Sequence, residues 1–189
     1  GTNLFASYVL PPLLSRFTEN FPLVRVNLIE ASTAELEEKL FAGILDLLID
    51  NQTMDPAVYE KTFLCQEHLL LVVPSHFAAN REVEDYALTL SDVKAGRHLE
   101  PGVRPVPLEA FREEAFLLLK SGNDTRIRAD RIFRESGHFL PRVRLELEQQ
   151  ITAYNLSRYG MGISFNGDVL LRHMLDDSGL TYYKLGYRD

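Results

Sequence analysis

Polar residues occupy the places where strand-like stretches give way to helix-like stretches. These places are the residues after Gly1, Ser32 with Thr33, Thr125, and Gln149 with Gln150. The first N–H groups of a helix have no partner inside the helix and carry a partial positive charge. In a parallel sheet such helix starts share one edge, which predicts a site for a small anion such as a carboxylate. On capping preferences alone, ordinary helix caps are the commoner explanation.

Other reactive side chains do not form a recognisable pattern. No Gly-x-Ser-x-Gly nucleophile motif and no phosphate-binding glycine loop is present. Cys65 is the only cysteine and is expected to be a buried strand residue. The histidines lack metal-binding spacing, so we expect no metal site and no cofactor; they are His68, His76, His98, His138 and His173.

Charge and hydropathy exclude two classes of partner. The formal net charge is −7 at pH 7, whereas nucleic-acid-binding domains present a basic face. One helix carries Arg126, Arg128, Arg131 and Arg134, which we expect to offset neighbouring acids or to lie at a subunit contact. The longest apolar run, 69–73, is far shorter than the roughly 20 residues of a membrane helix.

The elements that must position the polar residues follow from hydrophobic periodicity. In the first third, the patterns predict a helix over 7–20, a strand over 24–28, a helix closed by Gly43, and a strand over 45–49. A long extended stretch over 62–73 ends at Pro74, and short helices are expected near 90–93 and 108–113.

Strands and helices alternate in the last part of the chain. The predicted strands are 115–119, 143–147, 163–165 and 180–185, and the predicted helices are 125–136, 149–159 and 168–174. Strand–helix units thus lie at both ends of the chain, with no linker rich in glycine or serine. One lobe inserted into another explains this pattern, with 69–74 and 161–166 as adjacent strands that cross between the lobes.

An ordered series of motifs resembles the effector domains of LysR-type transcriptional regulators. The motifs cover nearly the whole chain; they include Leu10-Pro-Pro-Leu-Leu14, Phe21-Pro22, Ala42-Gly43, Leu70-Leu-Val-Val-Pro74-Ser-His76, Asn123-Asp-Thr-Arg126 and Tyr159-Gly-Met-Gly-Ile163. The stretch 96–109 matches no element of the family.

The resemblance implies an α/β, two-lobed fold like that of type II periplasmic binding proteins. Each lobe would hold a mostly parallel sheet flanked by helices, and two strands would cross over. Lobe I would comprise 1–72 and 166–189, and lobe II would comprise 73–165. The effector contacts implied by the resemblance are Thr2, Asn3, Ser32, Thr33, Ser121, Gln149 and Gln150.

The implied function is allosteric and not enzymatic. A small anionic, carboxylate-bearing effector would bind between the lobes of a cytoplasmic homodimer or tetramer, without membrane contact. DNA would be bound only through a winged helix–turn–helix domain N-terminal to this chain. Two alternatives stay open: a solute-binding protein of a transporter, and an enzyme on the same scaffold, which would need a catalytic nucleophile or acid in the cleft.

Overall fold

The computed structural model describes residues 5–31, 33–50, 54–137, 139–175 and 179–186. The chain divides into two compact units, 1–62 (unit 1) and 63–189 (unit 2). This division by contacts differs from the lobe boundaries expected from the sequence, which stay a prediction. Among the described helices, none has both the length and the apolar character that crossing a bilayer requires.

Unit 1 is helical in its described part. A π-helical turn, Phe5–Val9, leads into α1, Leu10–Asn20, and α2 spans Thr33–Phe41. Pro11 and Pro12 lie in the first turn of α1, where the fixed φ of proline is compatible with a helix. The residue after α2, Ala42, leads to Gly43, whose positive φ of 69° ends the helix as predicted.

The two strands predicted in unit 1 are not formed. Residues 24–28 and 45–49 are without strand pairing in the described part of the unit. An extended segment becomes a strand only when a neighbour satisfies its backbone N–H and C=O groups. Apolar side chains in both segments, among them Val24, Leu28 and Leu47, are consequently exposed. The predicted strand–helix–strand unit is therefore wrong for this part of the structure.

Unit 2 is built around one sheet of six strands. Their order across the sheet is β2-β6-β1-β5-β3-β4. The strands are β1 (Leu69–Pro74), β2 (Ala87–Leu88), β3 (Ala115–Leu119), β4 (Arg142–Leu147), β5 (Ile163–Gly167) and β6 (Leu180–Lys184). The alternating and apolar patterns predicted all of these except the short β2.

The predicted adjacency of 69–74 and 161–166 is confirmed. β1 and β5 pair in antiparallel register, with Leu69 opposite Gly167 and Leu71 opposite Phe165. β6 also runs antiparallel to β1 and to β2, whereas β3 is parallel to both β4 and β5. The sheet is thus mixed and not mostly parallel. β5 and β6 lie on either side of β1 and both run antiparallel to it, which gives the sheet its mixed character.

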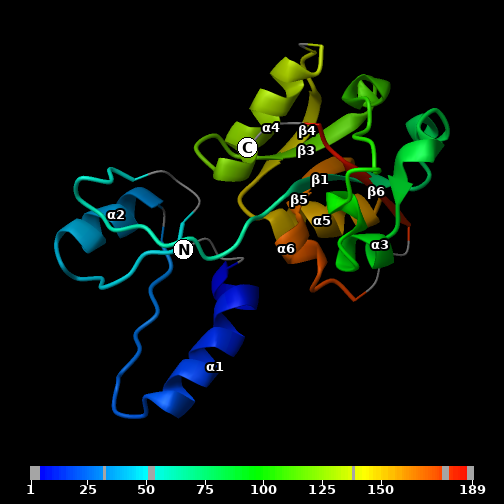
Figure 1. Ribbon diagram of the computed structural model, residues 1–189. Coiled ribbons are helices and arrows are strands. Elements are labelled where there is room, and N and C mark those ends of the chain that lie inside the picture. Colours follow the sequence, from blue (N-terminus) through cyan, green and yellow to red (C-terminus); the bar gives the residue numbers. More distant parts are fainter. Residues whose placement is uncertain (1–4, 32, 51–53, 138, 176–178, 187–189) are drawn as a thin grey trace. The chain divides into compact units, whose positions relative to one another are not determined.

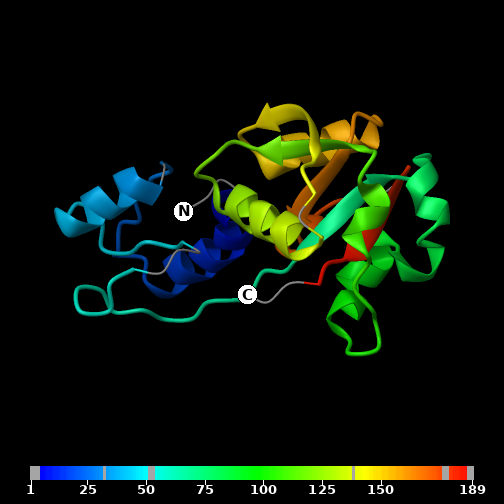
Figure 2. The same cartoon turned by 90° about the horizontal axis from the view of Figure 1, so that it is seen from above.

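Helices cover both faces of this sheet (Figures 1 and 2). Phe116 and Leu118 of β3 belong to the core cluster that includes Phe133 of α4, Asp124–Glu135. Leu117 and Leu119 point to the other face and pack with Ala153 of α5, Gln150–Arg158. The shorter helices are α3 (Leu90–Lys94), α6 (Asp168–Leu171) and the 3-10 turns Ala78–Arg81, Glu84–Tyr86, Arg97–Leu99 and Leu108–Phe111.

The stretch 96–109, which matched no family motif, contributes three buried side chains to unit 2: His98, Val106 and Leu108. His98 lies in the turn Arg97–Leu99 and is buried. The backbone N–H of Val106 donates to the Lys184 carbonyl at 2.9 Å, and Leu108 is fully buried. The stretch therefore extends the packing beside β6 and delivers a buried histidine.

Tyr183 provides a test of this core at alkaline pH. Its hydroxyl donates to Asn80 Oδ1 at 2.8 Å, and burial raises the pKa of Tyr183 to about 12. Because the folded pKa lies above the unfolded value of about 10, the neutral phenol contributes stability below pH 10. That contribution is lost as the pH rises toward 12. Urea denaturation between pH 9 and about 12 should show a steeper loss for wild type than for Tyr183→Phe. A difference in unfolding free energy that stays constant across this range would contradict the assignment.

Candidate functional site

Three parallel strands of unit 2 end at the same edge of the sheet. Leu119 of β3 is level with Leu147 of β4, and β5 ends beside them at Gly167. β1 begins at this edge, because Leu69 lies opposite Gly167. Residues that follow β3, β4 and β5, and residues that precede β1, therefore meet here. We call this the carboxyl edge.

The starts of α4 and α5 meet at the carboxyl edge. Asn123 caps α4, since its side chain accepts a hydrogen bond from the Thr125 N–H at 2.9 Å. The side-chain amide of Gln150, the first residue of α5, donates to the Thr125 hydroxyl at 2.7 Å. Two helix starts singled out in the sequence are thus joined by a direct hydrogen bond.

The two glutamines at the start of α5 differ in role. Gln150 Oε1 accepts from the Gly167 N–H at 2.8 Å, so both the nitrogen and the oxygen of its amide make a hydrogen bond inside the protein. Gln150 therefore positions the edge, and its predicted contact with an effector stays a prediction. Gln149 is half-buried and its side chain does not cap α5. Ser121 is exposed in the turn that follows β3.

A buried polar chain holds α5 against β5. Ser157 Oγ donates to Ser164 Oγ at 2.8 Å, and Ser164 Oγ donates to Asn166 Oδ1 at 2.7 Å. Asn166 in turn donates its amide to the Gln150 carbonyl at 3.0 Å. Satisfied buried networks of this kind fix one arrangement of the elements they join. The start of α5 is consequently held in place by the sheet.

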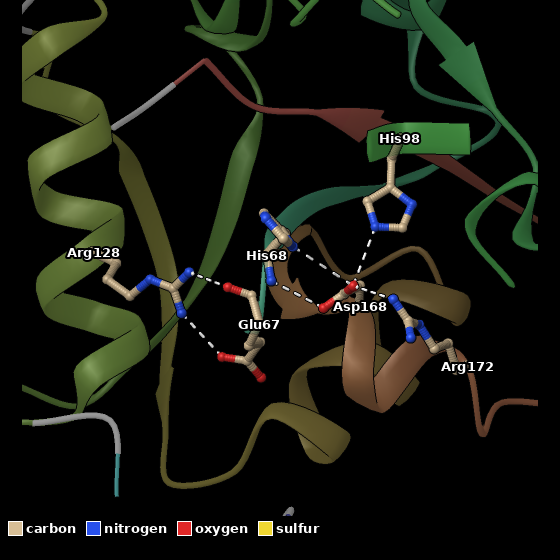
Figure 3. Close-up of polar contacts among 6 residues, drawn as sticks. All are labelled: Glu67, His68, His98, Arg128, Asp168 and Arg172. Carbon is tan, nitrogen blue, oxygen red and sulfur yellow. Dashed lines mark hydrogen bonds and ion pairs between the residues drawn. The ribbon is translucent and has the colours of Figure 1, made fainter. Parts of the chain in front are cut away.

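A second polar cluster at this edge centres on Asp168 (Figure 3). Asp168 begins α6 and is fully buried. One carboxylate oxygen accepts from the His68 backbone N–H at 2.9 Å, and the other accepts from Arg172 at 2.7 Å and lies 3.2 Å from His98 Nε2. Burial alone would raise the pKa of Asp168, but these hydrogen bonds and the Arg172 charge hold it below its usual value.

Glu67 and Arg128 form a buried ion pair beside this cluster (Figure 3). Arg128 donates to the Glu67 carboxylate at 3.0 Å and to the Glu67 backbone carbonyl at 3.1 Å. Burial raises the pKa of Glu67, although the Arg128 charge opposes the shift. Arg128 also lies 3.7 Å from Asp124, so the expected offset of neighbouring acids is present, whereas its main partner was not predicted.

Cys65 differs from its predicted environment. It was expected in a buried strand, but it is exposed and precedes the start of β1. Partial desolvation and the negative charges of Glu67 and Asp168 raise the pKa of the Cys65 thiol. A thiol that stays protonated near neutral pH is a poor nucleophile, so Cys65 offers no support for an enzyme.

Spacing in the sequence did not reveal the Asp168 cluster. His68 and His98 were judged by their distances along the chain, yet the fold brings both to Asp168. Donor atoms of these three residues all lie within 4.8 Å of one another. The available signal was the polar Glu67–His68 pair directly before an apolar strand, because residues that precede a strand lie at an edge of the sheet.

The predicted effector residues of unit 1 are not tested by the structure. Thr2, Asn3 and Ser32 lie outside the described residues. Thr33 is the first residue of α2, and its side chain is also outside the described part. All four stay predictions.

Comparison with known proteins decides the family. The sequence model described as "LysR substrate binding domain" matches residues 2–187. The chain belongs to this family. A LysR relative, the uncharacterized HTH-type transcriptional regulator YcgK of Bacillus subtilis (strain 168), is 28% identical over 179 residues, which are 94% of this chain and 53% of YcgK. The chain thus spans about half the length of the curated relatives it matches. The family consists of regulator domains and not of enzymes.

Solved structures show the same LysR effector-domain fold. The BenM effector-binding domain with its effector benzoate has a TM-score of 0.65 and 23% identity, over 100% of this chain and 76% of that chain. The CcmR regulatory domain of Synechocystis PCC6803 in complex with 2-PG has a TM-score of 0.67 and 22% identity, over 95% of this chain and 76% of that chain. These likenesses confirm an α/β fold of the type expected from the resemblance.

Proposed function

We propose that this chain is the effector-sensing domain of a LysR-type transcriptional regulator and binds a small carboxylate at the carboxyl edge of unit 2. The observation that carries the proposal is the meeting of two helix starts, α4 and α5, at the end of parallel strands. Gln150 and Thr125 hold these starts together at 2.7 Å. Both helices direct partial positive charge and backbone N–H groups to this edge.

The proposed contacts differ between the two helix starts. α4 is already capped by Asn123, whereas α5 begins without a side-chain cap. We therefore assign the main anion contact to the first-turn N–H groups of α5 and to Gln149, with Ser121 nearby in sequence at the end of β3. Benzoate and 2-phosphoglycolate, the ligands in the two related structures, both carry a carboxylate. Gln150 and, in unit 1, Thr2, Asn3, Ser32 and Thr33 also stay proposed effector contacts on the ground of the family resemblance.

The proposed output is allosteric. Effector binding would bias a DNA-binding domain attached N-terminal to this chain, in a cytoplasmic protein. The net charge of −7 disfavours direct DNA contact by this chain itself. YcgK is named as an HTH-type transcriptional regulator and is longer than the segment that matches this chain, which supports this arrangement.

Two substitutions test the site. Gln149→Ala and Thr33→Ala should each weaken effector binding about tenfold to a hundredfold, because one hydrogen bond to a charged group contributes about 1.5–3 kcal/mol. Isothermal titration calorimetry with benzoate and 2-phosphoglycolate identifies the ligand to use, and melting temperatures report folding.

Asn155→Ala is the matched control. Asn155 is exposed on the same helix as Gln149 but more than one turn away from its start. We expect its affinity to equal that of wild type. Unchanged affinity in both Gln149→Ala and Thr33→Ala would place the effector site elsewhere and would refute the assignment, even for a folded domain.

We also propose that the chain forms a homodimer through α1, or a tetramer through further contacts. Leu13 and Phe17 are exposed on this helix, and Phe21 is exposed directly after it. Clusters of exposed apolar side chains are rare on the surfaces of monomeric proteins and often mark an interface. Light scattering of the concentrated protein should give the dimer mass, and Phe17→Ser should shift the equilibrium toward monomer. A monomer at all concentrations would contradict this proposal.

A further inference from the structure

His68, His98 and Asp168 come from three separate elements and converge on one point (Figure 3). His68 precedes β1, His98 lies in a 3-10 turn, and Asp168 begins α6. In a tetrahedral zinc site with bonds of about 2.0–2.1 Å, donor atoms are roughly 3.4 Å apart. The observed separations from Asp168 Oδ2 are 3.2 Å to His98 Nε2 and 3.8 Å to His68 Nδ1. Small side-chain movements would therefore produce coordination geometry.

The donors are held in place and one of them is not satisfied. The Asp168 backbone N–H donates to the His68 carbonyl, and the His68 backbone N–H donates to the Asp168 carboxylate, each at 2.9 Å, which fixes the relative position of the two residues. His68 Nδ1 is buried and has no hydrogen-bond partner within the part of the chain that the structure describes. A buried polar atom without a hydrogen bond costs free energy, which a bound cation would recover.

In this structure Arg172 supplies the positive charge beside the Asp168 carboxylate. Its guanidinium donates to Asp168 Oδ2, the oxygen that both histidines approach. Arg172 directly follows α6 and its side chain is 46% exposed, so the guanidinium is able to turn away from Asp168 into solvent. The His68 side chain is 33% exposed, which gives an ion a route to the buried carboxylate. Arg172 thus occupies the coordination position of a cation and would compete with it.

We infer that unit 2 binds one divalent transition-metal ion, with Zn²⁺ as the best match, through His68 Nδ1, His98 Nε2 and Asp168 Oδ2. Two imidazoles and one carboxylate are ligands that zinc favours, and water fills the fourth position. Binding releases Arg172 from the carboxylate. This metal site is independent of the effector proposed above, because it uses none of the effector-contact residues.

The test is calorimetric titration of the EDTA-treated, dialysed chain with ZnCl₂, alongside Co²⁺ titration followed by visible absorption. We expect one ion per chain with a dissociation constant of about 10 µM or lower, and a higher melting temperature with zinc. Co²⁺ should give the strong absorption bands of a tetrahedral site. His68→Gln should weaken zinc binding at least about tenfold. Loss of a residue that only supports a metal ligand already lowers metal affinity by about that factor, and loss of the ligand itself should lower it at least as much.

Arg172→Leu separates metal ligation from a purely structural cluster. Removing the competing guanidinium should tighten zinc binding several-fold, whereas a structural role alone predicts only lower stability. The control is His76→Gln, since His76 is an exposed histidine outside the cluster and its loss should leave the affinity unchanged. His98→Gln should abolish binding; if it fails to fold, His68→Gln and Arg172→Leu still decide. Absence of one-to-one binding, or binding unaffected by both substitutions, would overturn the inference.

Discussion

Replacing Arg128 with methionine is expected to lower the free energy of unfolding by about 3–5 kcal/mol at pH 8. The substitution removes both hydrogen bonds that Arg128 makes to Glu67, one to the carboxylate and one to the backbone carbonyl. It leaves the Glu67 carboxylate buried without its counter-ion. Urea denaturation of both proteins measures the difference.

The pH dependence of this loss identifies its cause. Burial already raises the pKa of Glu67, and removal of the Arg128 charge should raise it further. A folded pKa above the unfolded value makes the folded state favour the protonated acid, so the loss should shrink as the pH falls toward 5.

Two controls accompany the Arg128 experiment. Arg134→Met changes an exposed arginine on the same helix and should alter stability by less than about 0.5 kcal/mol. The double variant Glu67→Gln with Arg128→Met removes both charges and should recover much of the loss. A pH-independent loss that the double variant does not relieve would show that Arg128 acts through packing alone.

Gly167→Ala should be the second most destabilising change, with a loss of about 2–3 kcal/mol. The backbone of Gly167 has φ of −68°, so alanine is not strained by its conformation. The reason is space: an added Cβ would lie 2.5 Å from Glu67 Cδ and 2.9 Å from Glu67 Cγ. The carboxylate has to move, and movement breaks its pair with Arg128.

The cost of Gly167→Ala should depend on the Glu67 side chain. In a Glu67→Ala background the methyl group has room, so the additional loss should fall to less than about 1 kcal/mol. Gly102→Ala is the matched control, because an added Cβ there meets nothing within 4 Å. Additive losses in the Gly167/Glu67 cycle would contradict the contact.

Local periodicity predicted most of unit 2. The strand–helix alternation over 115–167 has the expected order, and each element begins or ends within a few residues of its predicted bounds. In these elements, the apolar residues of each strand and helix pack into the hydrophobic core of unit 2, so the predicted elements are formed. Segment 24–28 alternates and segment 45–49 is a nearly continuous apolar run, but both remain unpaired. Strand pairing depends on a neighbour distant in the chain, which periodicity does not report.

The same distinction holds for the site. The helix starts at Thr125 and Gln150 are local features, and the structure brings them together. That Gln150 uses its amide internally could not be predicted, because its partner Gly167 is 17 residues away. The Asp168 cluster joins residues 70 and 100 positions apart, so motif spacing could not reveal it.

The most direct test of the proposed effector site follows the backbone amide chemical shifts by NMR while an effector is added. The carboxylate selected by calorimetry is added to the ¹⁵N-labelled chain until binding saturates. If the carboxyl edge of unit 2 binds the anion, the backbone amides of Gln150, Ile151 and Thr152 in the first turn of α5 should show the largest shift changes within unit 2. Saturated binding that leaves these three amides unchanged would contradict the proposed site.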